Sequence, residues 1–238
     1  MCPNDQALLN LLCDNLPLLD QQEAFSCLVC FLKRAIAIKT DKDKVLEISI
    51  PYSVNQPSTL AKYVFSSLQE NYEGEVLTLM VAGIYHLMFQ SKDYIVEVHP
   101  VNQSGASSKE ISDLDVYQTG TLFLANELKD KEYAETDVRH AADKVIAAGG
   151  DKLLFIEGPR GGCAPSIKSS LIKEYAQKNF HLVILPAWDF FNSSIALLPN
   201  VDCKKFMYFI LQKALDTKFK IETIDYLRKL ARTIFLMK

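Results

Sequence analysis

The stretch "LLFIEGPRGGCAPS", residues 153–166, decides the fold prediction for this chain. Four apolar residues run into an acid and then into a turn that contains glycine and proline. A helix-like segment precedes the stretch at 132–150, another follows at 166–179, and an apolar run comes next at 181–188. Apolar strands that alternate with helices predict an α/β domain with a mostly parallel central sheet flanked by helices.

The N-terminal part has a different pattern. Residues 6–38 carry leucines and other apolar side chains at helical spacing, and Pro17 marks a break. This pattern predicts an N-terminal helical hairpin. We therefore divide the chain into a helical cap at 1–42 and an α/β domain at 43–238.

Periodicity assigns the remaining segments of the α/β domain. The polar segment 102–115 predicts a loop. Helical patterns cover 59–72 and 221–238, and strand-like patterns cover 44–53, 75–90, 93–101, 119–126 and 204–215.

Composition narrows the function classes. The chain has 26 basic and 29 acidic residues, a net charge of −3 and no long block of either sign, so we expect no nucleic-acid partner. The apolar runs are too short to span a bilayer, and the beginning of the chain does not resemble a secretory signal. The six cysteines lack metal-site spacing, which favours reduced thiols in a cytoplasmic protein.

The loop after residue 156 is the first candidate site, because ligands of open α/β sheets bind beyond the carboxyl ends of strands. Glu157 ends the expected strand, Gly158 lets the backbone approach a ligand, and Arg160 and Lys168 supply cations, which together favour a phosphate. A surface ion pair between the acid and the arginine is the alternative. A nucleotide P-loop is excluded by spacing, because Cys163 stands where the second glycine is required.

The order of motifs resembles the glycerolipid acyltransferases, which include lysophosphatidic acid and glycerol-3-phosphate acyltransferases. The family's block F-P-E-G-T-R-S is similar to "FIEGPRGG" at Phe155, Glu157, Gly158 and Arg160. An earlier block is similar to "GTLFLANE" at 120–127, and a later one to "LVILPA" around Pro186. The likeness covers about residues 75–235.

The family's first block, H-x-x-x-x-D, supplies a general base. The resemblance gives this role to His86, because a neutral imidazole can take a hydroxyl proton near pH 7 and a carboxylate can stabilise the imidazolium. Ser91 stands where the family has its aspartate, so the expected partner is Asp93, with Glu97 as the alternative.

The resemblance implies an O-acyltransferase that moves a fatty acyl group from acyl-CoA or acyl carrier protein to a hydroxyl of a glycerophosphate or lysophospholipid. Glu157, Gly158, Arg160 and Lys168 would then bind the acceptor. It also implies that no metal or redox cofactor is needed, that an acyl thioester is the donor, and that the cytoplasmic protein meets lipid at a membrane surface.

Two other functions stay open. Cys27, His86 and Asn102 follow the order of papain-like thiol hydrolases, in which a cysteine attacks and a histidine held by an amide acts as base. The second alternative is a catalytically inactive homologue that binds lipid without turnover.

Overall fold

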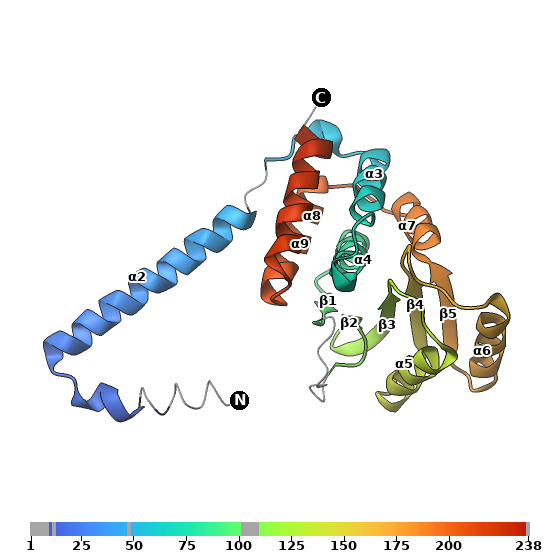
Figure 1. Ribbon diagram of the computed structural model, residues 1–238, viewed down its shortest axis with the longest axis horizontal. Helices are drawn as coiled ribbons and strands as arrows, with labels where there is room; N and C mark the ends of the chain where they lie inside the picture. The colour runs from blue at the N-terminus through green and yellow to red at the C-terminus, as the bar shows by residue number, and fades with distance from the viewer. Residues whose placement is uncertain (1–9, 11–12, 47–48, 101–109, 237–238) are drawn as a thin grey trace. The chain divides into compact units, whose positions relative to one another are not determined.

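The computed structural model describes residues 10, 13–46, 49–100 and 110–236 (Figure 1). The contacts divide the chain into a unit Met1–Glu47 and a unit Ile48–Lys238. The boundary that we predicted between residues 42 and 43 falls inside the last helix of the first unit, α2 (Gln21–Leu46).

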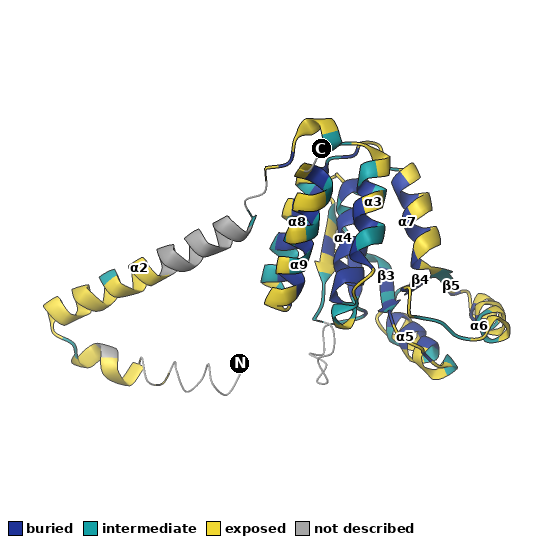
Figure 2. Cartoon of the chain, turned by 45° about the horizontal axis from the view of Figure 1, so that its top comes forward, coloured by how far each residue is buried: buried dark blue, intermediate teal, exposed yellow. Residues whose placement is uncertain are grey.

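The described part of the first unit consists of the short helix η1 (Leu16–Leu18) and the long helix α2. Asp20 starts α2, since its Oδ1 accepts from the backbone N–H groups of Gln22 and Glu23, and Glu23 Oε2 accepts from Asp20 N. Figure 2 shows the described surface of α2 to be mostly exposed. The predicted helical hairpin is not confirmed, because one continuous helix occupies most of its length.

The second unit holds the sheet and its covering helices. Their bounds are η2 (Tyr52–Val54), α3 (Pro57–Ser67), η3 (Tyr72–Gly74), α4 (Glu75–Met88), β1 (Tyr94–Val98), β2 (Leu114–Gln118), β3 (Thr121–Lys129), α5 (Glu135–Ala147), β4 (Lys152–Glu157), α6 (Pro165–Gln177), β5 (His181–Pro186), α7 (Ala187–Ala196), α8 (Cys203–Asp216), α9 (Ile221–Ala231) and η4 (Arg232–Leu236). No helix that the structure describes has the length and apolarity needed to cross a membrane.

The five strands form one sheet in the order β1-β2-β3-β4-β5. The predicted α/β class is confirmed, and the sheet is mixed: β1, β2 and β3 are antiparallel neighbours, whereas β3, β4 and β5 are parallel. A two-residue turn reverses the chain between β2 and β3, where Thr119 and Gly120 both have positive φ. Such a turn matches the twist of a hairpin, so a helical crossover is not needed there.

Helices cover both faces of the sheet (Figure 1). Helices α5 and α6 pack on one face, where Ala125, Leu153 and Phe155 join Val138 and Leu171 in a buried cluster. Helices α4 and α7 lie on the other face, and α3, α8 and α9 pack against this helical layer. The alternating side chains of each strand thus face two separate cores.

Several local predictions were wrong. Residues 75–90 and 204–215 were predicted as strands but form helices α4 and α8. Helix α4 is buried on nearly all sides, so its sequence is apolar throughout and does not show a helical stripe. The described residues of 44–53 do not form a strand either, because α2 continues through Leu46 and η2 begins at Tyr52. The loop predicted at 102–115 includes the first two residues of β2, Leu114 and Asp115. Residues 101–109 lie outside the described part.

Candidate active site

Asp113, Glu127 and Lys129 meet at the edge of the sheet where β2 begins and β3 ends. The register pairs Leu114 with Asn126, which places Asp113 beside Glu127. Glu127 and Lys129 are two residues apart on β3, so their side chains point to the same face of the sheet. Strand β4 runs parallel to β3 and also ends at this edge, with Glu157 as the register partner of Lys129.

Short contacts fix these three side chains. The Nζ of Lys129 lies 2.7 Å from Oε1 of Glu127. The backbone N–H of Leu128 donates to Oδ2 of Asp113 at 2.9 Å. The lysine therefore pairs with one acid, while the backbone of the neighbouring strand holds the other.

Burial and neighbouring charges shift the pKa values of Asp113 and Lys129. Burial raises the pKa of Asp113, and the negative charge of Glu127 adds to this effect, so that the pKa reaches about 7. Burial acts to lower the pKa of Lys129, but the carboxylates of Glu127 and Asp113 outweigh it, and the pKa is raised. Lys129 is therefore a cation at neutral pH, and Asp113, an acid with a raised pKa, stands next to it. Perturbed groups of this kind are frequent at functional sites.

A cavity of about 420 Å³ opens at this place, and we call it the edge cavity. It is lined by Asn71, Glu73, Gly74, Asp113, Leu128, Lys129, Asp130 and Lys131. The backbone at one lining residue is strained, because Glu73 and the preceding Tyr72 both have positive φ. Non-glycine residues in that conformation concentrate at functional sites.

The donor set of the edge cavity suits a hard divalent cation such as Mg²⁺. Asp113 lines the cavity, and Glu127, which is not among the lining residues, stands beside Asp113 on the neighbouring strand. No group of three or more His, Cys, Asp or Glu side chains gathers as a metal cage in the described ranges. Mg²⁺ usually binds through one or two carboxylates and fills its other positions with water and substrate phosphate oxygens. An acid that lines an open cavity, with a second acid beside it, fits that requirement.

A second cavity, of about 450 Å³, lies at the ends of β4 and β5, and we call it the tryptophan cavity. Its lining includes three of the residues predicted from the loop, Glu157, Gly158 and Lys168, together with Phe65 and Trp188. The Nζ of Lys168 lies 2.6 Å from Oε1 of Glu157. The structure therefore brings these three predicted residues together, and a ligand for them stays a prediction.

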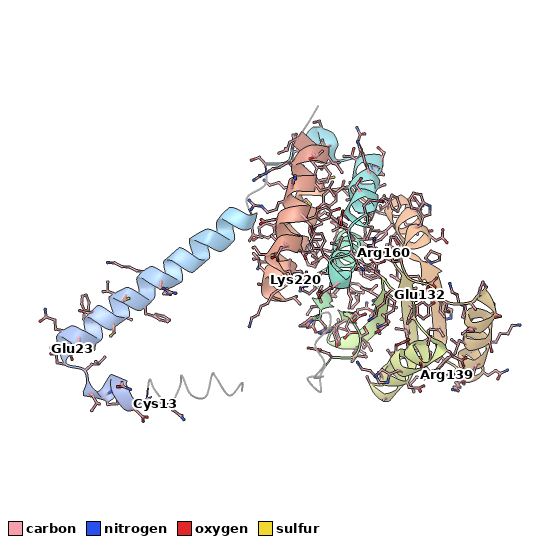
Figure 3. The ribbon with its side chains drawn as sticks, in the orientation of Figure 1. Cys13, Glu23, Glu132, Arg139, Arg160 and Lys220 are labelled. Atoms are coloured by element: carbon pink, nitrogen blue, oxygen red, sulfur yellow. The ribbon has the colours of Figure 1, made fainter. Side chains whose placement is uncertain are left out.

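Arg160, the fourth predicted residue of the loop, is engaged elsewhere (labelled in Figure 3). Its guanidinium donates to Oδ2 of Asp130 from both Nε and Nη2, and it reaches the carbonyl oxygens of Leu68 and Gln69 after α3. The Asp130 side chain is only 3% exposed. Arg160 thus ties the loop to the end of β3 and to α3, and it is not among the residues that line the tryptophan cavity.

His86 and Asp93 do not form the expected pair. His86 lies on α4, where its ring stacks on Phe209 at a centroid distance of 4.0 Å. Burial, with Lys205 and Lys213 as neighbouring cations, lowers the pKa of His86 to about 4. The Asp93 carboxylate instead accepts from Ser91 Oγ. His86 lines neither the edge cavity nor the tryptophan cavity, so it does not share a pocket with Glu157.

The three residues of the thiol-hydrolase alternative fall in different parts of the chain. Cys27 is an exposed residue of α2 in the first unit, whereas His86 belongs to the second unit. Asn102 lies outside the described residues. The structure describes the cysteines at 13, 27, 30, 163 and 203, and none of these five forms a disulfide.

The fold and the site define an α/β domain with an acid–acid–lysine cluster at the edge of a mixed sheet. Residues 53–159, less than half of the chain, match the family model of the SacI restriction endonuclease C-terminal domain. The matched segment runs from η2 to the end of β4 and contains Asp113, Glu127, Lys129 and Glu157. A search of curated proteins finds no match to this chain.

This match corrects the functional predictions. It supports an enzyme, but one similar to a restriction endonuclease domain and not a glycerolipid O-acyltransferase. The acyl donor, the lipid acceptor, the general-base role of His86 and the contact with a membrane surface lose their basis with that resemblance. The thiol-hydrolase and inactive lipid-binding alternatives do not match either, and the expectation of no nucleic-acid partner is wrong. That expectation was drawn from the net charge of the whole chain, whereas a nucleic-acid site depends on where the charges lie.

Asp113, Glu127 and Lys129 were missed as site residues, although Glu127 lies in the block "GTLFLANE" that was compared with the acyltransferases. Two short motifs could have indicated them. "DLDVYQ", residues 113–118, carries Asp113 at the start of a short strand, and "ELK", residues 127–129, places an acid and a lysine two residues apart at the end of an apolar strand. The first part was read as loop, so its acid could not be placed beside the second.

Proposed function

We propose that this chain is a nuclease that hydrolyses phosphodiester bonds of DNA at the edge cavity. The observation that carries the proposal is the cluster of Asp113, Glu127 and Lys129 within the segment that matches a restriction endonuclease domain. Acidic residues beside a lysine, at the open end of a sheet, are suited to phosphoryl chemistry.

Asp113 and Glu127 would hold a divalent cation through their carboxylate oxygens. When bound, such a cation supplies Lewis-acid stabilisation of charge on the phosphoryl oxygens. The like-charge interaction that raises the pKa of Asp113 favours this role, because a cation between the two acids relieves it. In the protein without a cation the two carboxylates repel each other, and a bound cation would remove this repulsion.

Lys129 would act on the scissile phosphate as a fixed cation. Its raised pKa keeps the proton on Nζ at neutral pH, which excludes it as a general base in that state. The bond to Glu127 Oε1 orients the ammonium group, and one of its remaining N–H donors can bond a phosphoryl oxygen. A fixed donor stabilises negative charge that develops as water attacks phosphorus and the P–O bond of the leaving strand breaks.

Cleavage of closed circular plasmid DNA tests this proposal. The purified chain should convert the plasmid to nicked or linear forms with Mg²⁺ or Mn²⁺ and leave it intact with EDTA. Glu127→Gln should abolish conversion, whereas Glu222→Gln, a matched change on the exposed surface of α9, should leave it unchanged. Cleavage by Glu127→Gln at the wild-type rate would contradict the assignment.

A further inference from the structure

The tryptophan cavity has a flat aromatic wall. The ring of Trp188 stacks on Phe65 at a centroid distance of 4.0 Å and an interplanar angle of 29°. Phe191 in turn meets Phe65 edge-on. Trp188 is nevertheless 59% exposed, so ring surface remains open beside the cavity that it lines. An aromatic ring that is held in place but still exposed is suited to stacking with another planar ring.

The same cavity has a buried, charged floor. Glu157 is only 4% exposed, and its Oε1 accepts from the Tyr133 hydroxyl at 2.7 Å. Burial and the neighbouring Cys163 and Glu157 raise the pKa of Tyr133, so the phenol keeps the proton that it donates. The Oε2 of Glu157 accepts from Lys168 Nζ at 2.7 Å. The Nζ of Lys168 also lies 2.6 Å from Oε1, so Oε1 already has two partners. Oε2 can accept a second hydrogen bond and the ammonium group has a third N–H, so both groups retain capacity for a ligand.

An acceptor and a donor therefore stand side by side below an aromatic wall. An amino group next to a ring nitrogen is complementary to that pair, because the amino group donates to the carboxylate and the ring nitrogen accepts from the ammonium. Cytosine and adenine carry this pattern on their pairing edge, whereas thymine presents a carbonyl in place of the amino group. We propose that the tryptophan cavity binds one unpaired cytosine or adenine base of a DNA strand.

The position of the cavity fits a base that belongs to the strand at the edge cavity. Lys129 and Glu157 are register partners, and neighbouring strands are about 4.8 Å apart. The loop that follows Glu157 packs directly on the end of β3, since a Cβ on Gly161 would lie 2.2 Å from Lys129 O. A strand with its phosphate at Lys129 can thus place a neighbouring base at Glu157. The inference rests on the proposed function only in taking DNA as the source of the base.

Trp188 is the one tryptophan in the sequence, so intrinsic fluorescence reports on this cavity. The full chain is titrated in EDTA, where cleavage cannot occur, with oligodeoxycytidylate, oligothymidylate and an abasic oligomer of equal length. We expect the cytosine oligomer to quench the fluorescence and to bind roughly tenfold more tightly than the abasic oligomer, with thymine weaker than cytosine.

A variant separates stacking from general attraction of the backbone. Trp188→Ala should weaken binding of labelled oligodeoxycytidylate about tenfold, as measured by fluorescence anisotropy. The control is Tyr208→Ala, which removes another exposed aromatic residue, on α8, and should leave binding unchanged. Because Trp188 is largely exposed, its replacement is not expected to unfold the domain; circular dichroism checks this.

Equal quenching by the abasic oligomer, equal affinity for cytosine and thymine, or unchanged affinity after Trp188→Ala would each overturn the base-binding proposal. The proposed nuclease activity fails by a separate result, which is an intact plasmid after incubation of the wild-type chain with Mg²⁺. Base-selective quenching alongside an intact plasmid would support the tryptophan cavity and reject the nuclease. Plasmid cleavage without base-selective quenching would support the nuclease and reject base binding in the tryptophan cavity.

Discussion

Lys129 and Glu157 are register partners at the carboxyl ends of the parallel strands β3 and β4. Each belongs to an oppositely charged pair, because Lys129 contacts Glu127 and Glu157 contacts Lys168. The two pairs stand next to each other along one sheet edge. Lys129 lines the edge cavity, whereas Glu157 and Lys168 line the tryptophan cavity. The parallel pairing of two strands is therefore what brings the proposed cleavage site and the proposed base site together.

Replacing Lys129 by Met should separate cleavage from binding. The variant loses the cation proposed to stabilise charge on the phosphate, so we expect cleavage to fall by roughly 10²–10³-fold. Binding of a DNA duplex in EDTA, measured by anisotropy, should fall far less, because one phosphate contact is a small part of an interface. Lys178→Met, in an exposed helix pair, is the matched control. Equal losses in cleavage and binding would show that Lys129 only attracts the backbone.

Replacing Asp113 by Asn should stabilise the metal-free protein above neutral pH. The folded pKa of about 7 lies above the ordinary value of 3.8, so the folded state binds this proton more tightly than the unfolded state. The resulting stability is complete below pH 4 and is lost as the pH rises through 7. Asparagine can still accept from Leu128 N.

Urea unfolding in EDTA at two pH values measures this effect. The stability of Asp113→Asn relative to wild type should be greater at pH 8 than at pH 5 by about 2 kcal/mol. A stability difference that does not change between the two pH values would show that burial and Glu127 do not raise the pKa of Asp113.

The two neighbouring glycines of the loop after β4 should respond differently to alanine. A Cβ on Gly161 would lie 2.2 Å from the carbonyl oxygen of Lys129, which is backbone and cannot move alone. A Cβ on Gly162 would have no neighbour within 4 Å. Thermal unfolding should therefore show a loss of about 2 kcal/mol or more for Gly161→Ala and little change for Gly162→Ala. Equal losses would mean that the loop does not pack on β3 as described.

Replacing Arg160 by Ala should destabilise the fold, because it leaves the buried Asp130 carboxylate without its partner. Arg160 is 37% exposed, so solvent reduces the loss below that of a fully buried pair, and we expect about 2 kcal/mol. Lys178→Ala, which breaks an exposed pair with Glu174, should cost much less. If both variants unfold at the same urea concentration, Arg160 does not hold the loop.

The sequence predicted the α/β class because β3, α5, β4, α6 and β5 alternate clearly between strand and helix patterns. It did not predict the antiparallel half of the sheet. Strand β2 has only five residues, and Asp113 and Asp115 flank its first residue, Leu114, so its start resembled a polar loop. Helix α4 was mistaken for a strand because it is apolar on nearly every side.

The candidate site was predicted in part. Glu157, Gly158 and Lys168 do meet at the end of β4, because a strand followed by a turn and a helix fixes their relative positions. Asp113 could not be placed beside Glu127 without β2, since that contact depends on strand pairing and not on nearness in sequence. The short motif around Glu157 also suggested a family that the longer match rules out.

The most direct test of the proposed nuclease site is the initial rate of plasmid cleavage with Mg²⁺ for wild type, Asp113→Asn, Glu127→Gln and the double variant. Acids that hold one cation act as a unit, so each single change should reduce the rate about as far as both together. Cleavage by either single variant at the wild-type rate would contradict the claim that Asp113 and Glu127 form the active site.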